Sequence, residues 1–110
     1  MNLISRLTGM FSRGGRDEER LRQAMEHAKA NRPERAMQIY NSLVASTTTD
    51  REVRAKALFN RALAHSSLKE DQRALEDLSR VLALPNVPDS VTTAARSQLA
   101  RVRKRSERRA

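Results

Sequence analysis

The stretch LFNRALAHSSLKEDQRALEDLSRVLALP, residues 58–85, decides the fold because an earlier stretch repeats its pattern. That earlier stretch is RQAMEHAKANRPERAMQIYNSL, residues 22–43. A spacing of 38 positions separates the matching residues: Ala24 and Ala62, His27 and His65, Arg35 and Arg73, Ala36 and Ala74, Tyr40 and Leu78, Ala45 and Ala83. A fixed period of about 20–50 residues is typical of solenoid arrays, in which each unit buries its apolar face against its neighbour. The repeat therefore predicts a scaffold that presents a surface rather than a pocket for catalysis.

Apolar side chains recur every three or four positions along the chain, which predicts amphipathic helices. Glycine and proline are rare, so we expect an all-α fold: a short solenoid of antiparallel helix pairs with an N-terminal amphipathic helix. After that first helix, the predicted helix starts lie at Asp17, Pro33, near Asp50, Asp71, and Asp89 or Ser90. The spacing from Thr49 to Glu52 is that of a capping box, and Asp71 is predicted to be an N-cap.

The two ends of the chain are predicted to differ from its middle. Residues 1–16 place apolar side chains at helical spacing: Leu3, Ile4, Leu7, Met10 and Phe11. Gly14-Gly15 predicts the end of this helix and a hinge. Beyond Val102 the chain is nearly all charged, and we expect it to fray. The predicted parts are an amphipathic basic segment, 1–16, a helical domain, 17–105, and a basic disordered tail, 106–110.

The net charge of +9 is concentrated in those ends. Residues 1–16 carry +3, residues 17–89 are neutral, and residues 90–110 carry +6. Such asymmetry indicates that the ends contact something anionic. The chain has no cysteine, which excludes disulfides and thiolate chemistry. It also lacks an apolar run of the roughly 20 residues that span a bilayer.

From Asp17 to about Pro88 the chain resembles two degenerate tetratricopeptide repeats, followed by a C-terminal capping helix. The resemblance is carried by Ala24, His27, Ala36, Tyr40 and Leu43 in the first unit, and by Leu58, Ala62, His65, Ala74, Leu78 and Val81 in the second. The motif Phe59-Asn60-Arg61-Ala62 is especially typical of the family. The period of 38 exceeds the family's period of about 34, which places about four additional residues in the loop 46–50.

The resemblance implies a groove lined by the first helix of each pair. The implied groove residues are Leu21, Met25, Lys29, Lys56, Phe59, Asn60, Leu63 and Ser67. We expect a non-catalytic adaptor in which a peptide or helix of a partner protein packs against Met25, Phe59 and Leu63. The alternative is that the N-terminal helix covers this face, or that a second copy of the chain covers it and forms a homo-oligomer.

The C-terminal cations are a second candidate site, for a polyanion. They are Arg101, Arg103, Lys104, Arg105, Arg108 and Arg109. They would neutralise the phosphates of RNA, DNA or lipid head groups, or they serve only as a solubilising tail. Since no aromatic residue accompanies them, stacking on nucleic-acid bases is not supplied here. A nucleic-acid-associated protein is therefore the alternative function.

The N-terminal helix has three interpretations. It docks on the helical body, lies on an anionic membrane surface through its apolar face and arginines, or belongs to an organelle transit peptide. We expect a cytoplasmic protein, with peripheral membrane attachment or organelle targeting as the alternatives.

No residues form a recognisable catalytic or metal site in this sequence. His27 and His65 occupy equivalent helical positions, where packing in place of tyrosine explains them better than metal binding, and no third ligand is apparent. Nucleophile elbows, phosphate loops and paired-acid motifs are absent from the sequence. We therefore expect no enzyme activity, no metal and no cofactor.

Overall fold

The computed structural model describes the backbone of residues 2–109 and the side chains of residues 15–109. This part of the chain contains five helices and no strand, which confirms the all-α prediction. The helices are α1 (Asn2–Lys29), α2 (Pro33–Ala45), α3 (Arg51–Ser67), α4 (Asp71–Ala83) and α5 (Asp89–Arg109).

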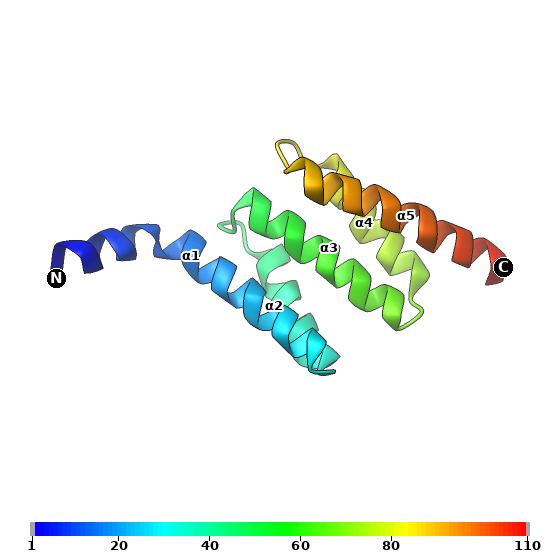
Figure 1. Ribbon diagram of the computed structural model, residues 1–110, viewed down its shortest axis with the longest axis horizontal. Helices are drawn as coiled ribbons and strands as arrows, with labels where there is room; N and C mark the ends of the chain where they lie inside the picture. The colour runs from blue at the N-terminus through cyan, green and yellow to red at the C-terminus, as the bar shows by residue number, and fades with distance from the viewer. Residues whose placement is uncertain (1, 110) are drawn as a thin grey trace.

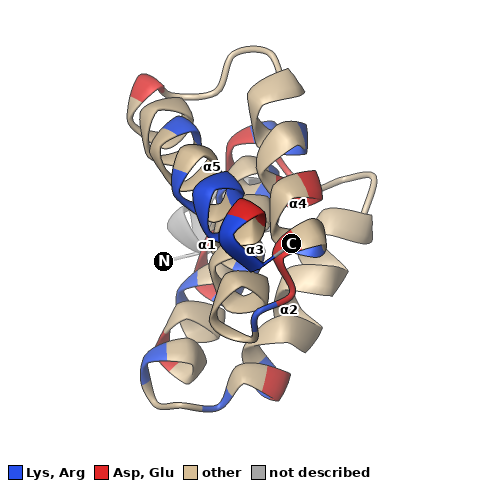
Figure 2. Ribbon diagram, turned by 90° about the vertical axis from the view of Figure 1, so that its right-hand side faces the viewer, with Lys and Arg blue, Asp and Glu red and all other residues tan. Residues whose placement is uncertain are grey.

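The helices stack as antiparallel pairs in two layers. Each helix packs against the next along the chain, and α3 also contacts both α1 and α5 (Figure 1). Helices α1, α3 and α5 form one layer, and α2 and α4 form the other, as the turned view shows (Figure 2). The predicted short solenoid of helix pairs is therefore confirmed.

The 38-residue period of the sequence is also the period of the backbone. The ends of α1 and α3, the starts of α2 and α4, and the starts of α3 and α5 are each 38 residues apart. Asn31 and Lys69 occupy equivalent turns and both adopt the left-handed conformation, with φ of 61°. Because α5 begins one period after α3, it corresponds to the first helix of a third unit. Within the described chain, α5 is the last helix of the array.

Two adjoining clusters form the core. Tyr40 and Leu43 are the largest fully buried side chains of the cluster that joins α1, α2 and α3. Leu58 and Leu78 play the same part in the cluster that joins α3, α4 and α5. The alanines predicted at the helix contacts are fully buried: Ala24, Ala36, Ala62 and Ala74. Alanine at these positions allows the paired helices to approach closely, and a longer side chain would overpack the interface.

Tyr40 provides a spectroscopic test of this core. Its burial raises the pKa of the phenol, because removal from water disfavours the phenolate. Tyr40 is the only tyrosine in the chain, so the ultraviolet absorbance of phenolate reports this residue alone. We expect a native titration midpoint above that of the urea-unfolded chain, which should lie near pH 10.

The sign of the accompanying stability change follows from the same shift. The folded state holds the phenolic proton of Tyr40 more tightly than the unfolded state does. The contribution of this proton to the free energy of unfolding is therefore complete below about pH 10, and it falls as pH rises through the folded pKa. Equal midpoints in the native and unfolded chain would contradict the burial of Tyr40.

The predicted helix end and hinge at Gly14-Gly15 are wrong. Helix α1 continues from Asn2 to Lys29, so no break separates 1–16 from 17–105. A helix interior tolerates glycine at a cost of about 1 kcal/mol relative to alanine. A glycine that ends a helix usually does so in the left-handed conformation, which Gly15 does not adopt.

The predicted caps of α3 and α4 are also wrong. Asp50 is the N-cap residue of α3 and makes no side-chain cap, while Thr49 is buried with its Oγ1 unbonded. Glu70 is the N-cap residue of α4, and Asp71 follows inside the helix. Tertiary contacts use Asp71 instead: its carboxylate accepts hydrogen bonds from the last turns of α5.

Those contacts overturn the predictions of a disordered tail at 106–110 and of fraying beyond Val102. Helix α5 continues to Arg109, and Arg105 and Arg109 donate to the Asp71 carboxylate at 2.7 and 2.8 Å. Arg105 also donates to the Ser66 hydroxyl at 2.6 Å. Because Asp71 is only 8% exposed, these charge-assisted bonds hold the end of α5 against α3 and α4. Ala110 lies outside the described residues.

Candidate functional site

The layer of α1, α3 and α5 presents the predicted groove residues. The three helices run in the same direction, so residues one period apart form rows across the layer (Figure 1). Met25, Leu63 and Arg101 form one row, since each is 38 positions from the next. We call the surface marked by Met25, Phe59, Leu63 and Arg101 the three-helix face.

The apolar groove residues divide into one buried residue and three that reach the surface. Leu21 belongs to the core, with 6% of its surface exposed, so its assignment to the groove is wrong. Its side chain is enclosed by the first core cluster, whereas its equivalent, Phe59, is partly exposed. Met25, Phe59 and Leu63 are all half-buried, a state that fixes a side chain while leaving apolar atoms accessible.

The polar groove residues are engaged within their own helix. Lys56 forms an ion pair with Glu52 at 3.1 Å, and Asn60 donates to the carbonyl of Lys56 at 2.8 Å. Ser67 donates to the carbonyl of Leu63 at 3.0 Å. These groups therefore border the apolar residues rather than converge on a common point. Lys29 is exposed at the end of α1.

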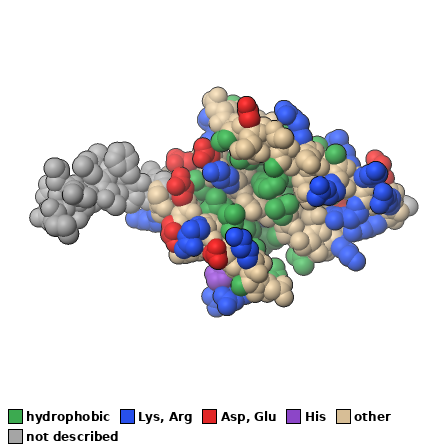
Figure 3. Space-filling model, viewed as in Figure 1, with side chains coloured by type: hydrophobic (Ala, Val, Ile, Leu, Met, Phe, Trp, Pro, Cys, Tyr) green, Lys and Arg blue, Asp and Glu red, His purple; other side chains and the backbone are tan. Residues whose placement is uncertain are grey.

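The three-helix face is most basic at one end. The space-filling view shows acidic and basic side chains mixed at its left, hydrophobic side chains at its centre and mainly basic side chains at its right (Figure 3). The sequence contributes to this distribution. Glu52 and Asp89 lie in the first turns of α3 and α5, and Arg108 and Arg109 lie in the last turn of α5. Both placements are favourable, because the helix dipole is positive at the N-terminus and negative at the C-terminus.

The six predicted polyanion-binding cations are not equivalent. Arg105 and Arg109 share the single Asp71 carboxylate, so this cluster keeps one net positive charge and both guanidinium groups are held in place. The other four are exposed: Arg101, Arg103, Lys104 and Arg108. They form no ion pair with any other residue whose side chain is described. Figure 2 shows the resulting concentration of basic residues at the end of α5.

A polar network that sequence reasoning missed joins α2, α3 and α4. Arg61 donates two hydrogen bonds to the Asp77 carboxylate, both at 2.8 Å, and a third to Asn41 at 3.0 Å. His65 Nδ1 lies 2.8 Å from Glu70 Oε1, and this hydrogen bond lowers the pKa of Glu70. His65 thus fills a helix contact, as predicted, but with polar partners. Among the described residues no group of three potential ligands could hold a metal ion.

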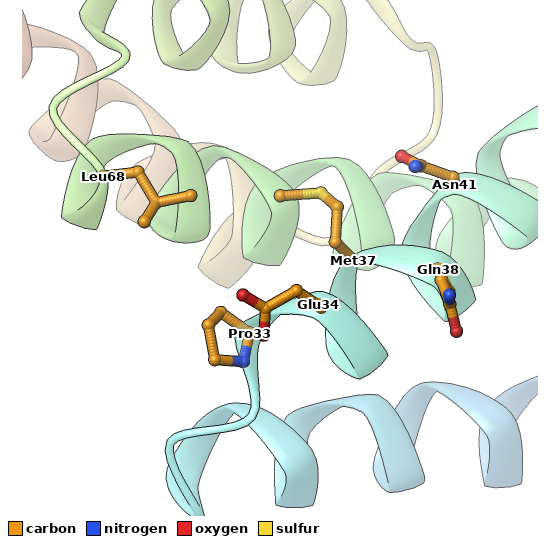
Figure 4. A pocket seen from close by; sticks show the side chains of 6 residues that line it. All are labelled: Pro33, Glu34, Met37, Gln38, Asn41 and Leu68. Carbon is orange, nitrogen blue, oxygen red and sulfur yellow. The ribbon is translucent and has the colours of Figure 1, made fainter.

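A shallow hollow lies beside this network, on the side of α2. Its lining residues are Pro33, Glu34, Met37, Gln38 and Asn41 of α2, together with Leu68 after the end of α3 (Figure 4). The hollow measures about 290 Å³, and Leu68, at 53% exposure, is the most exposed large hydrophobic residue of the described part. None of the predicted groove residues lines it.

The predicted membrane or docking residues lie outside the part of the chain whose side chains are described: Leu3, Ile4, Leu7, Met10 and Phe11. Their backbone continues α1, which extends past the ends of the other helices (Figure 1). Within the described residues, no helix combines the length and apolar character needed to cross a membrane.

Comparison with known proteins adds no relative to this description. No family model, no curated protein and no solved structure matches the chain.

Proposed function

We propose that this chain is a non-catalytic interaction module, a degenerate tetratricopeptide-type array that holds a segment of a partner protein on the three-helix face. One observation supports this most strongly. Met25, Phe59 and Leu63 are only partly buried, and hydrophobic side chains gather at the centre of the face that Figure 3 shows. Contiguous exposed apolar surface of this kind marks interaction sites in folded proteins.

The physical argument concerns rigidity as well as apolarity. Phe59 and Leu63 project from α3, the central helix, which packs against each of the other four helices. Their side chains are already half-buried, so a partner has little side-chain entropy to remove when it covers them. A peptide helix or extended segment that lies across them would bury the remaining apolar atoms at roughly 25 cal/mol per Å².

The test compares two identical substitutions at different places. Leu63→Ser removes apolar surface from the three-helix face, and Leu68→Ser makes the same change at the hollow beside α2. We expect tagged Leu63→Ser protein to recover at least about tenfold less of its partners from nuclease-treated lysate than the unmodified chain, because central apolar anchors carry most of the binding energy. Leu68→Ser protein should recover the partners normally, and circular dichroism should show both variants folded.

Two results would contradict the proposal. One is equal recovery by Leu63→Ser protein and the unmodified chain. The other is loss of all recovered proteins on nuclease treatment, which would favour the alternative, nucleic-acid binding through the exposed cations of α5. That alternative is weakened by the ion pairs of Arg105 and Arg109, which leave four of the six predicted cations free among the described residues.

A further inference from the structure

We propose that the segment held on the three-helix face is acidic and amphipathic, with apolar residues on Met25, Phe59 and Leu63 and carboxylates on a basic stripe of α5. The basic stripe consists of Arg101, Lys104 and Arg108. This inference rests on the proposed function, because it specifies the chemistry of the partner for the same face.

The spacing of the stripe places its three cations on one side of α5. Arg101, Lys104 and Arg108 are three and four positions apart, so they follow one another along a single helix face. All three are exposed, and none forms an ion pair with another described side chain. The stripe extends about 10 Å, at 1.5 Å per residue, which is two turns of a partner helix.

The repeat connects the stripe to the apolar patch. Arg101 stands in the third unit where Leu63 stands in the second and Met25 in the first. A ligand that crosses the layer along this row therefore meets two apolar side chains and then a guanidinium. In Figure 3 the hydrophobic centre of the face adjoins its basic end in the same way.

The clamp on Asp71 gives the stripe a fixed position. Arg105 lies between Lys104 and Arg108 in sequence, and it donates to Ser66 on α3 and to Asp71 on α4. Arg109 adds a second bond to Asp71. With its last turns held in this way, α5 presents the stripe from a rigid helix, and binding need not order a flexible tail.

The other side of α5 provides a matched control. Arg96 and Arg103 are seven positions apart and exposed, and by helical periodicity they face away from the stripe, beyond the last helix of the array. Replacing Arg96 and Arg103 by Glu changes the net charge as much as replacing Arg101 and Lys104 by Glu. The two double variants thus separate a local contact from a general effect of charge.

Nucleic acid fits this surface less well than an acidic polypeptide does. A phosphate backbone would use the three cations and leave the adjoining apolar patch without a partner. Three phosphate contacts also give only weak, salt-sensitive binding. An acidic amphipathic segment would bind both parts of the surface: its apolar side chains would cover the apolar patch, and its carboxylates would pair with the basic stripe. Charge pairs at the rim of an interface steer association and select partners.

The experiment is a selection of peptides from a displayed random library on the full chain, followed by fluorescence anisotropy with the best synthetic peptide. We expect enriched peptides to carry Asp or Glu within about one or two helical turns of Leu, Ile, Phe or Trp. Arg101→Glu with Lys104→Glu should weaken the peptide at least about tenfold, and Arg96→Glu with Arg103→Glu should change its affinity less than about threefold. Leu63→Ser should also weaken it, and Leu68→Ser should not.

Each other outcome overturns a defined part of the account. Peptides that need Leu63 but show no acidic preference, or that ignore Arg101→Glu with Lys104→Glu, would overturn the acidic partner and leave the proposed function standing. Failure to enrich peptides, or binding indifferent to Leu63→Ser, would overturn both. A single-stranded RNA or DNA oligonucleotide that binds more tightly than the best peptide, and through the stripe alone, would also overturn both in favour of nucleic acid.

Discussion

Replacing Asp77 by alanine should lower the free energy of unfolding by about 3 kcal/mol or more. The Asp77 side chain is almost fully buried and accepts two hydrogen bonds from Arg61. The Arg61 side chain is itself only 16% exposed. The Asp77 carboxylate is the main compensation for removing the Arg61 guanidinium from water. Loss of Asp77 therefore leaves this guanidinium buried, with Asn41 as its remaining partner. Breaking one side of a buried ion pair typically costs about 3–5 kcal/mol.

Urea unfolding followed by circular dichroism measures this loss. The control is Glu76→Ala, because Glu76 is the preceding residue, carries the same charge and is exposed. We expect it to shift stability by less than about 0.5 kcal/mol. The combined change of Arg61 to Met and Asp77 to Leu should recover much of the loss, since an apolar pair replaces a buried ion pair at little cost. Equal stability of Asp77→Ala and Glu76→Ala would show that the network does not hold α3 to α4.

Leu43→Ala should destabilise the chain by about 3 kcal/mol for a different reason. Leu43 is fully buried in the cluster that joins α1, α2 and α3. Truncation there loses the transfer free energy of the side chain and leaves a cavity, a combination that costs about 2–5 kcal/mol. The total stability of a small domain is only about 5–15 kcal/mol. Leu43→Ala should therefore unfold at a measurably lower temperature and at a lower urea concentration than the unmodified chain.

The matched control for this change is Leu68→Ala. Leu68 is 53% exposed, so the same truncation should alter stability by less than about 0.5 kcal/mol. Both variants can be compared by urea unfolding and by the phenolate titration of Tyr40, which shares the cluster with Leu43. A Leu43→Ala chain as stable as the Leu68→Ala chain would mean that the first helix pair does not pack as described.

The helical fold was predictable because its signals are periodic and local. The spacing that aligns Ala24 with Ala62 and Ala36 with Ala74 also set the helix boundaries, and all four alanines are buried. Pro33 marked a helix start correctly, since Pro fits the first turn of a helix, and Asn31 before it adopts a positive φ, which Asn tolerates.

Several of the errors concern polar residues whose roles depend on distant parts of the chain. Asp71 has the local signature of an N-cap, yet its partners, Arg105 and Arg109, come from the other end of the domain. The same contacts hold the nearly all-charged sequence beyond Val102, which was predicted to fray, as the last turns of a helix. Asp77 belongs to no motif, and the motif that contains Arg61 does not indicate its partner. The pairing of Arg61 with Asp77 becomes visible only when α3 and α4 are placed side by side.

The candidate site was partly predictable for the same reason. The resemblance implied that Met25, Phe59 and Leu63 lie on one face, and each of them is partly exposed in the structure. It could not separate Leu21, which the core encloses, from its equivalent Phe59. Nor could it distinguish the cations held by Asp71 from the exposed ones, because that distinction depends on the packing of α5.

The most direct test of a binding site on the three-helix face is a nuclear magnetic resonance titration of the isotope-labelled full chain with the best selected peptide. We predict that the largest amide shifts will cluster around Met25, Phe59, Leu63 and Arg101, and that the amides around Met37 and Leu68 will stay unchanged. Shifts centred on the hollow beside α2, or spread evenly over the five helices, would contradict a binding site on the three-helix face.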